Sequence, residues 1–488
     1  MTAQEFSIQG NFQADRSTPL RWVLSHVGRH KHLFVIMFIG AFGNGALAAA
    51  IPVFTGIAFT GVLADPVDYE RLQLAAIGII VSQVLRSLLQ FGRNFASEVI
   101  GQRLERDTRQ ELYLSLLGKS MTFHDSQPVG DTMARATNDV REVNLMLNPG
   151  INLVVGSANF MIMPLIFAPQ YDPRLIFAPL FYIILYIFAL IRYLNVLRPI
   201  SDDVRGSFGS LNSRLAEAID GIETVKGAAQ EEQEVAMFRQ NARAFRNAAV
   251  EQGYVEARYL PLLLLGVTNA IGFAHALLLF QQGAVATADV VAYMGLLALF
   301  GFPTFISLRA YSQVASGMAG ARRILELIKE ETDLDANASG YDGEMKGGVT
   351  FEKVTFGYVD SVPVLQDISL TIEPGQTVAI VGQTGSGKST VAKLINRTYD
   401  VGTGRVLIDG RDVRQWNLAA VRRQTSIIEQ DIFMFSRTVA ENIAFGQPQA
   451  TREEIIDAAK TAQAHEFIMG FKDGYDTIVG ERGVTLSG

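Results

Sequence analysis

Cysteine is absent from this sequence of 488 residues, which excludes disulfides, thiolate catalysis and metal sites built on cysteine. Charge is also sparse, because Asp, Glu, Lys and Arg make up 19% of the chain, against about 25% in soluble domains. The net charge of −7 predicts no broad basic surface, so nucleic acid is not an expected partner. Apolar residues make up 49% of the chain, and we therefore expect part of it to lie in a membrane.

Long apolar stretches are confined to residues 33–318. The clearest is Leu175–Ile191, which holds no charged residue and is close to the shortest length that crosses a bilayer. Because a chain in lipid must satisfy its own backbone hydrogen bonds, helices are expected here rather than open strands. Six spans are predicted, near residues 33–59, 72–95, 148–168, 173–193, 259–281 and 288–310.

The distribution of Lys and Arg predicts the orientation of these spans. Both residue types gather before the first span and in the long connections after the second and fourth spans, whereas the other connections are short and carry few of them. The positive-inside rule therefore places the N-terminus and both long connections in the cytoplasm. The N-terminus is polar and mixed in charge through Asp15, so a cleavable signal peptide is not predicted. A bacterial inner membrane is the expected location.

The two long connections are expected to be helical, over Glu98–Ser120 and Asn212–Ala249, because both are charged and carry apolar residues at helical spacing. We predict that the membrane helices continue through them into the cytoplasm; the alternative is two small soluble bundles. Residues 324–348 are acidic and then small and polar, which is typical of a linker. The predicted domains are thus 1–323, which is membrane-embedded, and 349–488, in which short β-branched runs alternate with amphipathic helices.

A glycine-rich loop follows the predicted strand Gln376–Val381 and precedes a helical pattern at Thr390–Arg397. This order is the context that a phosphate-binding loop requires. Backbone amides of such a loop attract phosphate oxygens, a lysine adds positive charge, and a serine hydroxyl can ligate Mg²⁺. The candidate nucleotide-binding residues are Gly382, Gln383, Thr384, Gly385, Ser386, Gly387, Lys388, Ser389 and Thr390. The alternative is a chance glycine-rich turn, and the motif by itself does not define a reaction.

Other motifs flank this loop. Phe-Gly-Tyr358 ends the alternating strand predicted at Val349–Phe356, and Gln430 lies in Ile-Ile-Glu-Gln-Asp-Ile-Phe. Helices are predicted at Thr438–Gly446 and, from the capping pair Thr451 and Glu454, as far as about Phe471. The chain closes on Thr477-Ile-Val-Gly-Glu-Arg-Gly483 and Leu486-Ser487-Gly488, while Phe123-His-Asp125 and Glu217–Lys226 lie in the long connections.

In this order, the motifs resemble those of the ATP-binding cassette (ABC) superfamily, specifically exporter-type half-transporters. The resemblance covers nearly the whole chain. It implies six transmembrane helices that extend into the cytoplasm, followed by an α/β phosphate-loop cassette that binds ATP and Mg²⁺. It also implies short coupling helices in both long connections, which dock on cassettes.

The resemblance assigns roles to single residues. Tyr358 would stack on adenine. Gln430 would approach Mg²⁺ and the attacking water, although Glu429 stands where proline is common in the family. Ser487 and Gly488 would bind the γ-phosphate held by the opposite cassette. The family's catalytic carboxylates and switch histidine would lie beyond Gly488, so we expect the chain as given to bind ATP but not to hydrolyse it.

The implied function is ATP-driven export of a hydrophobic or amphipathic small molecule, lipid or peptide by alternating access, with a second half-transporter as partner. The alternatives are a degenerate or regulatory half of a heterodimer, an ATP-gated channel or a scaffold. Polar residues within the spans are candidates for contact with substrate, or else for hydrogen bonds between helices. They are Asn44, Arg86, Asn159, Asn269, His275 and Arg309, of which Arg86 and Arg309 are the two to test for lining a cavity; a long side chain among them can instead reach the membrane edge.

Overall fold

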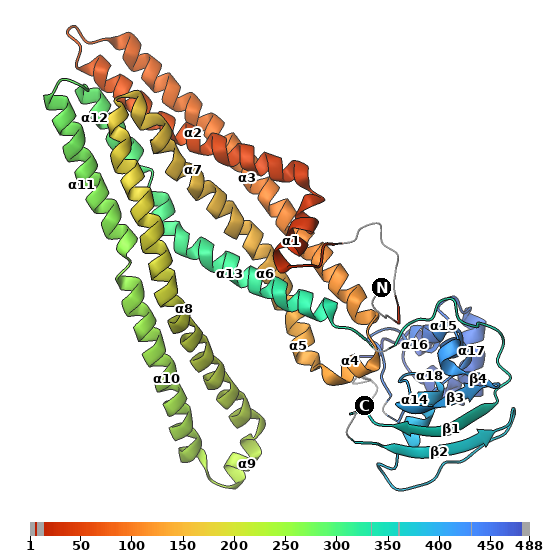
Figure 1. The fold of residues 1–488 in the computed structure, drawn as a ribbon. Helices are drawn as coiled ribbons and strands as arrows, with labels where there is room; N and C mark the ends of the chain where they lie inside the picture. The colour runs from red at the N-terminus through yellow and green to blue at the C-terminus, as the bar shows by residue number, and fades with distance from the viewer. Residues whose placement is uncertain (1–4, 7–13, 333, 360–361, 431, 481–488) are drawn as a thin grey trace. The chain divides into compact units, whose positions relative to one another are not determined.

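The computed structural model describes all residues except 1–4, 7–13, 333, 360–361, 431 and 481–488 (Figure 1). Its contacts divide the chain into two compact units. The helical unit comprises residues Phe12–Leu112 and Met133–Leu327, and the sheet unit comprises Met1–Asn11, Tyr113–Thr132 and Ile328–Gly488. The sheet unit therefore includes a segment that follows the second predicted span.

Most of the helical unit is built from long helices, some of them interrupted by short π or 3₁₀ segments. Its helices, of which α3, α5 and α13 include residues of the sheet unit, are α1 (Pro19–Gly28), α2 (Lys31–Val62), α3 (Tyr69–Leu117), α5 (Val129–Ala134), α6 (Val140–Leu145), α7 (Asn152–Phe167), α8 (Phe177–Asp220), α9 (Ile222–Gly227), α10 (Glu231–Ala257), α11 (Leu260–Gln281), α12 (Thr287–Ala298) and α13 (Gly301–Lys329). The interruptions are two π segments, Arg135–Asp139 and Met146–Ile151, and two 3₁₀ segments, Ala168–Gln170 and Pro173–Ile176.

Six helical stretches of the described chain are long and apolar enough to cross a membrane, which confirms the six predicted spans. They are Lys31–Val62, Tyr69–Leu117, Val129–Gln170, Pro173–Asp220, Glu231–Gln281 and Thr287–Lys329. The second and fourth spans continue without a break as α3 and α8, so the connections after them extend the membrane helices. Helix α13 likewise continues to Lys329, within the segment expected to be a linker.

The last predicted span, 288–310, is not one helix, because a turn at Leu299 and Phe300 separates α12 from α13. Pro303 explains the break: proline has no N–H, so the carbonyl of Leu299 lacks its partner four residues on. Thr304 Oγ1 donates a hydrogen bond of 2.6 Å to the carbonyl oxygen of Phe300 beside the break.

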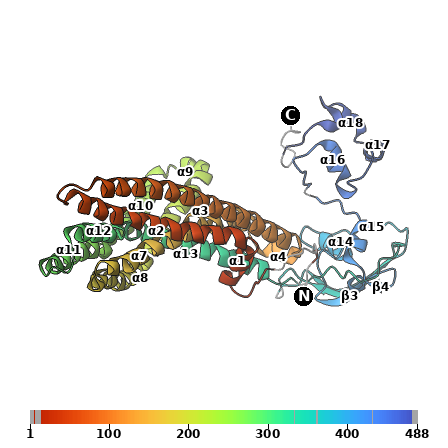
Figure 2. The same cartoon turned by 90° about the horizontal axis from the view of Figure 1, so that it is seen from above.

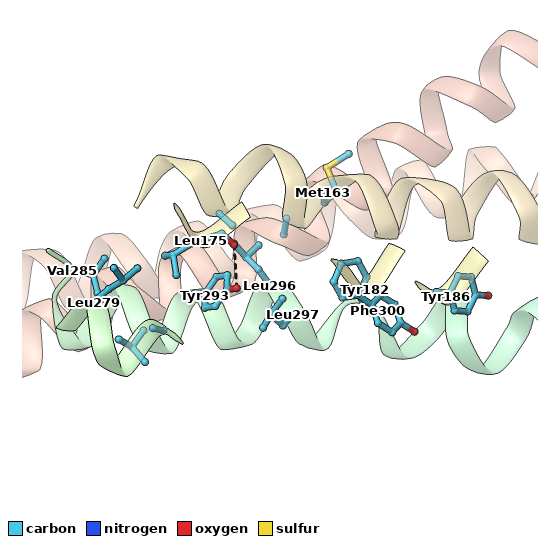
Figure 3. Close-up of a cluster of buried hydrophobic side chains, with 14 residues drawn as sticks. Met163, Leu175, Tyr182, Tyr186, Leu279, Val285, Tyr293, Leu296, Leu297 and Phe300 are labelled. Atoms are coloured by element: carbon cyan, nitrogen blue, oxygen red, sulfur yellow. Dashed lines mark hydrogen bonds between the residues drawn. The ribbon is translucent and has the colours of Figure 1, made fainter. Parts of the chain in front are cut away.

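An apolar core joins α7, α8, α11 and α12 in the helical unit (Figure 3). Leu296, Leu297 and Phe300 are fully buried there. The polar tips of its tyrosines are satisfied, as a low-dielectric interior requires: the hydroxyl of Tyr293 donates to the carbonyl oxygen of Leu175 at 3.1 Å. Tyr182 shares a hydrogen bond with Thr304.

Small residues allow α2 to pack closely against α12. A Cβ placed on Gly295 would lie 2.5 Å from Cβ of Pro52, and one on Gly56 would lie 2.9 Å from Cβ of Ala292. Two helices approach this closely only where one of them lacks a side chain, which is typical of membrane helix pairs.

Helices α8 and α10 pack along each other and are joined by the short helix α9, forming a two-helix stalk (Figure 1; Figure 2 gives the view from above). Arg214 on α8 donates to both carboxylate oxygens of Glu234 on α10, at 2.5 and 2.6 Å. The rings of Phe208 and Phe245 lie 5.4 Å apart. The buried residues of α8 end at Leu197, and α10 has none among its described residues.

The sheet unit contains a four-stranded antiparallel sheet in the order β2-β1-β3-β4. The strands are β1 (Val349–Phe356), β2 (Leu365–Ile372), β3 (Thr403–Ile408) and β4 (Arg411–Asp412). Strand β1 has the bounds that its alternating sequence predicts, and its buried residues Phe351, Val354 and Phe356 pack with Leu394 of helix α14 (Lys388–Ile395).

The remaining helices of this unit are short. They are α4 (Met121–Ser126), α15 (Leu418–Gln424), α16 (Val439–Ile443), α17 (Arg452–Thr461) and α18 (His465–Met469). The capping box of Thr451 and Glu454 is present at the start of α17. The helix predicted to reach Phe471 is wrong in length, because the chain turns after Thr461 with Gln463 at a positive φ of 59°.

The strand predicted at Gln376–Val381 is also wrong, because this segment is irregular in the structure. None of the described strands pairs with it. Val378, Ile380 and Val381 are exposed as a result. A β-branched run gives a strand only when a neighbour supplies the ladder of hydrogen bonds.

Candidate functional site

The glycine-rich loop leads directly into α14, with Gly387 as the residue that precedes the helix. Gly385 has a φ of +84° and Gly387 a φ of +87°, which side-chain-bearing residues rarely adopt. A Cβ on Gly387 would also lie 2.7 Å from Cδ2 of Leu365. The loop therefore depends on glycine at this position for both conformation and space.

Lys388 begins α14 and turns back over the loop. Its Nζ donates to the carbonyl oxygens of Gly382 at 3.0 Å and Gln383 at 2.7 Å. No carboxylate forms an ion pair with Lys388 in the described part of the chain. The ammonium is thus held beside the loop by neutral carbonyl groups, and no carboxylate of the described residues pairs with its charge.

These features fit a bound triphosphate. The residues from Gly382 to Ser386 are exposed, with the amides of the loop and the N-terminus of α14 next to the Lys388 charge. Oriented amides and a helix N-terminus are the donors that phosphate oxygens require. Ser389 is exposed at the start of the helix, where its hydroxyl can offer one oxygen to a metal ion. Mg²⁺ commonly takes its other ligands from substrate phosphates and water.

Tyr358 connects this loop to two other aromatic residues. Its hydroxyl shares a hydrogen bond of 3.1 Å with Oγ1 of Thr390, which is buried on α14. Its ring meets the rings of Phe356 and Tyr399 edge to face, with centroids 5.1 and 5.2 Å away. Tyr358 keeps 43% of its surface exposed, so its ring is held in place but remains available for stacking.

Tyr399 in turn contacts α4, from the first long connection. Its hydroxyl donates to Oδ2 of Asp125 at 2.5 Å. Burial, together with the hydrogen bond to Asp125, raises the pKa of the Tyr399 phenol, so Tyr399 stays protonated and remains the donor at neutral pH. Tyr399 and Asp125 are 274 residues apart in the chain, and sequence reasoning identified only Asp125.

Lys119 fixes the chain just before α4. Its Nζ donates to the carbonyl oxygen of Ile328 at 3.2 Å and also to that of Glu330. Together with the bond between Asp125 and Tyr399, these contacts make α4 part of the sheet unit. A short helix was predicted at this motif, and α4 provides it.

Other predicted site residues are not brought to the loop. Gln430 is exposed and, within the described residues, makes no hydrogen bond to the loop. Ser487 and Gly488 lie outside the described residues. Of the polar residues in the spans, Asn44 and Arg86 line a cavity of about 820 Å³, whereas Arg309 is exposed and does not. The side chain of Asn159 donates to the carbonyl oxygen of Val155 at 2.8 Å, within its own helix.

Comparison with known families matches nearly the whole chain. The profile of the ABC transporter transmembrane region matches residues 34–304, and that of the ABC transporter matches residues 365–488. Proteins of Staphylococcus aureus strains NCTC 8325 / PS 47 and COL are 31% identical over 468 residues, covering 93% of this chain and 80% of each relative. Both are named multidrug export ATP-binding/permease proteins.

A solved structure of a bacterial Atm1-family ABC exporter with ATP bound is also similar, with a TM-score of 0.76 and 26% identity. The similarity covers 94% of this chain and 81% of that chain. The chain therefore belongs to the ABC transporter family.

Within this family its architecture is that of an exporter-type half-transporter, since one chain carries the transmembrane region and then the cassette. This confirms the resemblance inferred from the motifs. It makes the chain a multi-pass membrane protein, and the cassette implies ATP binding and ABC-type ATPase activity.

Proposed function

We propose that the protein is one half of a dimeric transporter that exports a hydrophobic or amphipathic compound at the expense of ATP. The observation that carries this proposal is a continuous set of contacts in the sheet unit. It runs from the phosphate loop through Thr390, Tyr358 and Tyr399 to Asp125 on α4. Through it, occupation of the nucleotide site can act on a segment that lies between two membrane spans.

Each candidate residue has a proposed task. The loop residues Gly382 to Ser389 surround the phosphates, Lys388 neutralises their charge, and Tyr358 stacks on adenine. Ser389 and Gln430 contribute oxygen ligands to Mg²⁺, and Ser487 and Gly488 act on the nucleotide of the partner half. Bound ATP supplies a γ-phosphoryl group whose transfer to water releases the free energy for transport.

The orientation follows from the distribution of Lys and Arg, which supports a cytoplasmic cassette in a bacterial plasma membrane. The multidrug export named for the S. aureus relatives supports an apolar or amphipathic substrate. The second half of the transporter is either an identical chain or a different one. Transport by a purified homodimer would show that an identical chain is sufficient.

Lys388→Ala tests the site. Loss of one charged contact costs about 1.5–3 kcal/mol, so the affinity for a fluorescent ATP analogue should fall about 10- to 100-fold. Lys393→Ala is the matched control, because it removes the same charge from the same helix. Transport should stop in Lys388→Ala alone, with assembly unchanged. Equal nucleotide affinity in both variants would show that this loop is not the nucleotide site.

A further inference from the structure

The cavity lined by Arg86 lies in the helical unit and has a volume of about 820 Å³. Helices α2, α3, α7 and α13 contribute to it, and the residues used below are Asn44, Arg86, Arg93, Asn152, Phe160 and Phe302. This volume is within the range of small-molecule sites, about 300–1,000 Å³. The walls combine aromatic rings with amides and two guanidinium groups.

Arg93 is 5% exposed. Its Nε and Nη2 donate to the side-chain and main-chain oxygens of Asn152, at 2.6 and 2.5 Å. Two glycines make room for it. A Cβ on Gly156 would lie 2.4 Å from Nη2 of Arg93, and one on Gly40 would lie 2.8 Å from its Cβ. Helices on both sides are therefore shaped to hold a charged group that is costly to place in a membrane.

Arg86 lies two helical turns before Arg93 on α3, so the two side chains share a face. Its Nη1 donates to Oε1 of Gln83 at 3.3 Å, and its guanidinium lies 5.9 Å from the centre of the Phe160 ring. Both partners are neutral. Arg86 is half-buried, and its other guanidinium donors remain available to a molecule in the cavity.

The charge of the cavity is not balanced by the described residues. Glu98 is its one acidic lining residue among those described, and its carboxylate accepts from Nδ2 of Asn148 at 2.5 Å and from Nε2 of Gln102 at 2.9 Å. In the described part of the chain, neither Arg86 nor Arg93 forms an ion pair with a carboxylate. Two guanidinium groups beside apolar cavity walls attract an anion more strongly than they would in bulk water.

We propose that Arg86 and Arg93 form the anion-binding end of a site for amphipathic molecules, which carry a carboxylate or phosphate beside an apolar body. Arg86 contacts the anionic group directly, and Arg93, held by Asn152, contributes its positive field. Phe160 and Phe302 pack against the apolar body. The site rests on the proposed export function in one respect, since it assigns the class of compound that is exported. A membrane lipid has the same chemistry as such a compound.

Direct binding of a fluorescent fatty acid tests the proposal. Dansyl-undecanoic acid and its methyl ester are titrated, without nucleotide, into the protein in phosphatidylcholine nanodiscs. The wild type should bind the acid at least about tenfold more tightly than the ester, because charge-assisted hydrogen bonds are lost in the ester. Arg86→Gln should remove this difference and leave ester binding unchanged.

The matched control is Arg309→Gln, which removes a membrane-region arginine that does not line the cavity. It should keep the wild-type preference for the acid. Phe160→Ala should weaken acid and ester equally. Wild-type affinity for the acid in Arg86→Gln, or the same loss in Arg309→Gln, would overturn the proposal. Size-exclusion profiles and melting temperatures show whether each variant is folded.

Two further arms identify the source of the anion and separate this proposal from the export function. In proteoliposomes, ATP should drive movement of the acid across the bilayer if it is a transported compound. Retention of the acid despite ATP, with competition by phosphatidylglycerol, would instead identify the site as one for resident anionic lipid, which still supports the anion site. Because binding needs no nucleotide, Lys388→Ala should bind the acid normally even where it fails to transport.

Discussion

Removing the hydroxyl of Tyr399 should loosen α4 from the sheet unit. Tyr399 is 5% exposed, and its hydroxyl donates to the Asp125 carboxylate at 2.5 Å. A hydrogen bond to a charged group contributes about 1.5–3 kcal/mol, which corresponds to about 10- to 100-fold in an equilibrium constant. In Tyr399→Phe the backbone amides of α4 should therefore become exposed about 10- to 100-fold more often.

Hydrogen–deuterium exchange of the peptide that contains Met121–Ser126 measures this opening. Tyr341→Phe is the control, because Tyr341 also packs in the sheet unit but its hydroxyl has no hydrogen-bond partner in the described structure. In an Asp125→Asn background, Tyr399→Phe should have a much smaller effect, since the charged acceptor is already gone. Exchange in Tyr399→Phe within twofold of the wild type, or equal effects in both backgrounds, would refute the reasoning.

Three other perturbations test separate contacts. Gly387→Ala should destabilise the sheet unit more than Gly385→Ala. Both substitutions cost about 1–2 kcal/mol because of the positive φ, but only Gly387→Ala brings a Cβ to 2.7 Å from Leu365. Chemical unfolding followed by the fluorescence of the buried Trp416 measures the difference, and equal losses of stability would argue against the contact. Hydrogen bonds from the backbone and side chain of Thr438 lower the pKa of Glu441, so the cap of α16 should persist above pH 4.5, the ordinary pKa, and weaken as the pH falls through the lowered pKa. Hydrogen–deuterium exchange of the α16 amides should speed up over this pH range. Glu441→Gln should abolish this dependence on pH. Gly156→Ala should weaken binding of dansyl-undecanoic acid by displacing the Arg93 guanidinium, which lies 2.4 Å from the added Cβ, whereas Gly92→Ala, with nothing within 4 Å of the added Cβ, should not.

Local patterns predicted much of this fold. Strand β1 and the capping box at Thr451 follow from side-chain periodicity and from residues three apart, which are present in the sequence itself. The six spans were identified from the length and apolar content of each stretch, which are also local properties of the sequence. The candidate phosphate loop was recognised because its glycines and lysine lie close together in the chain.

Features that depend on distant residues were missed. The segment Gln376–Val381 has a strand composition, but pairing with another strand decides whether it becomes one. The bond between Tyr399 and Asp125 joins residues 274 apart, and a lone tyrosine after a helix gives no signal of it. Arg86 and Arg309 were equivalent as intramembrane arginines in the sequence, and only the packing of α3 on α7 placed one of them at a cavity.

The stalk of α8, α9 and α10 has a consequence for local stability. Segments that bury little apolar surface open at low free-energy cost, well below that of global unfolding. In α10, and in α8 beyond Leu197, none of the described residues is buried. Contacts between the two helices therefore include the ion pair of Arg214 with Glu234 and the ring contact of Phe208 with Phe245, but no buried apolar core. In a single chain, the backbone amides of this hairpin should therefore exchange early. A partner surface that covers the hairpin on assembly should slow its exchange more than that of the packed core, because the core is already stable in the single chain.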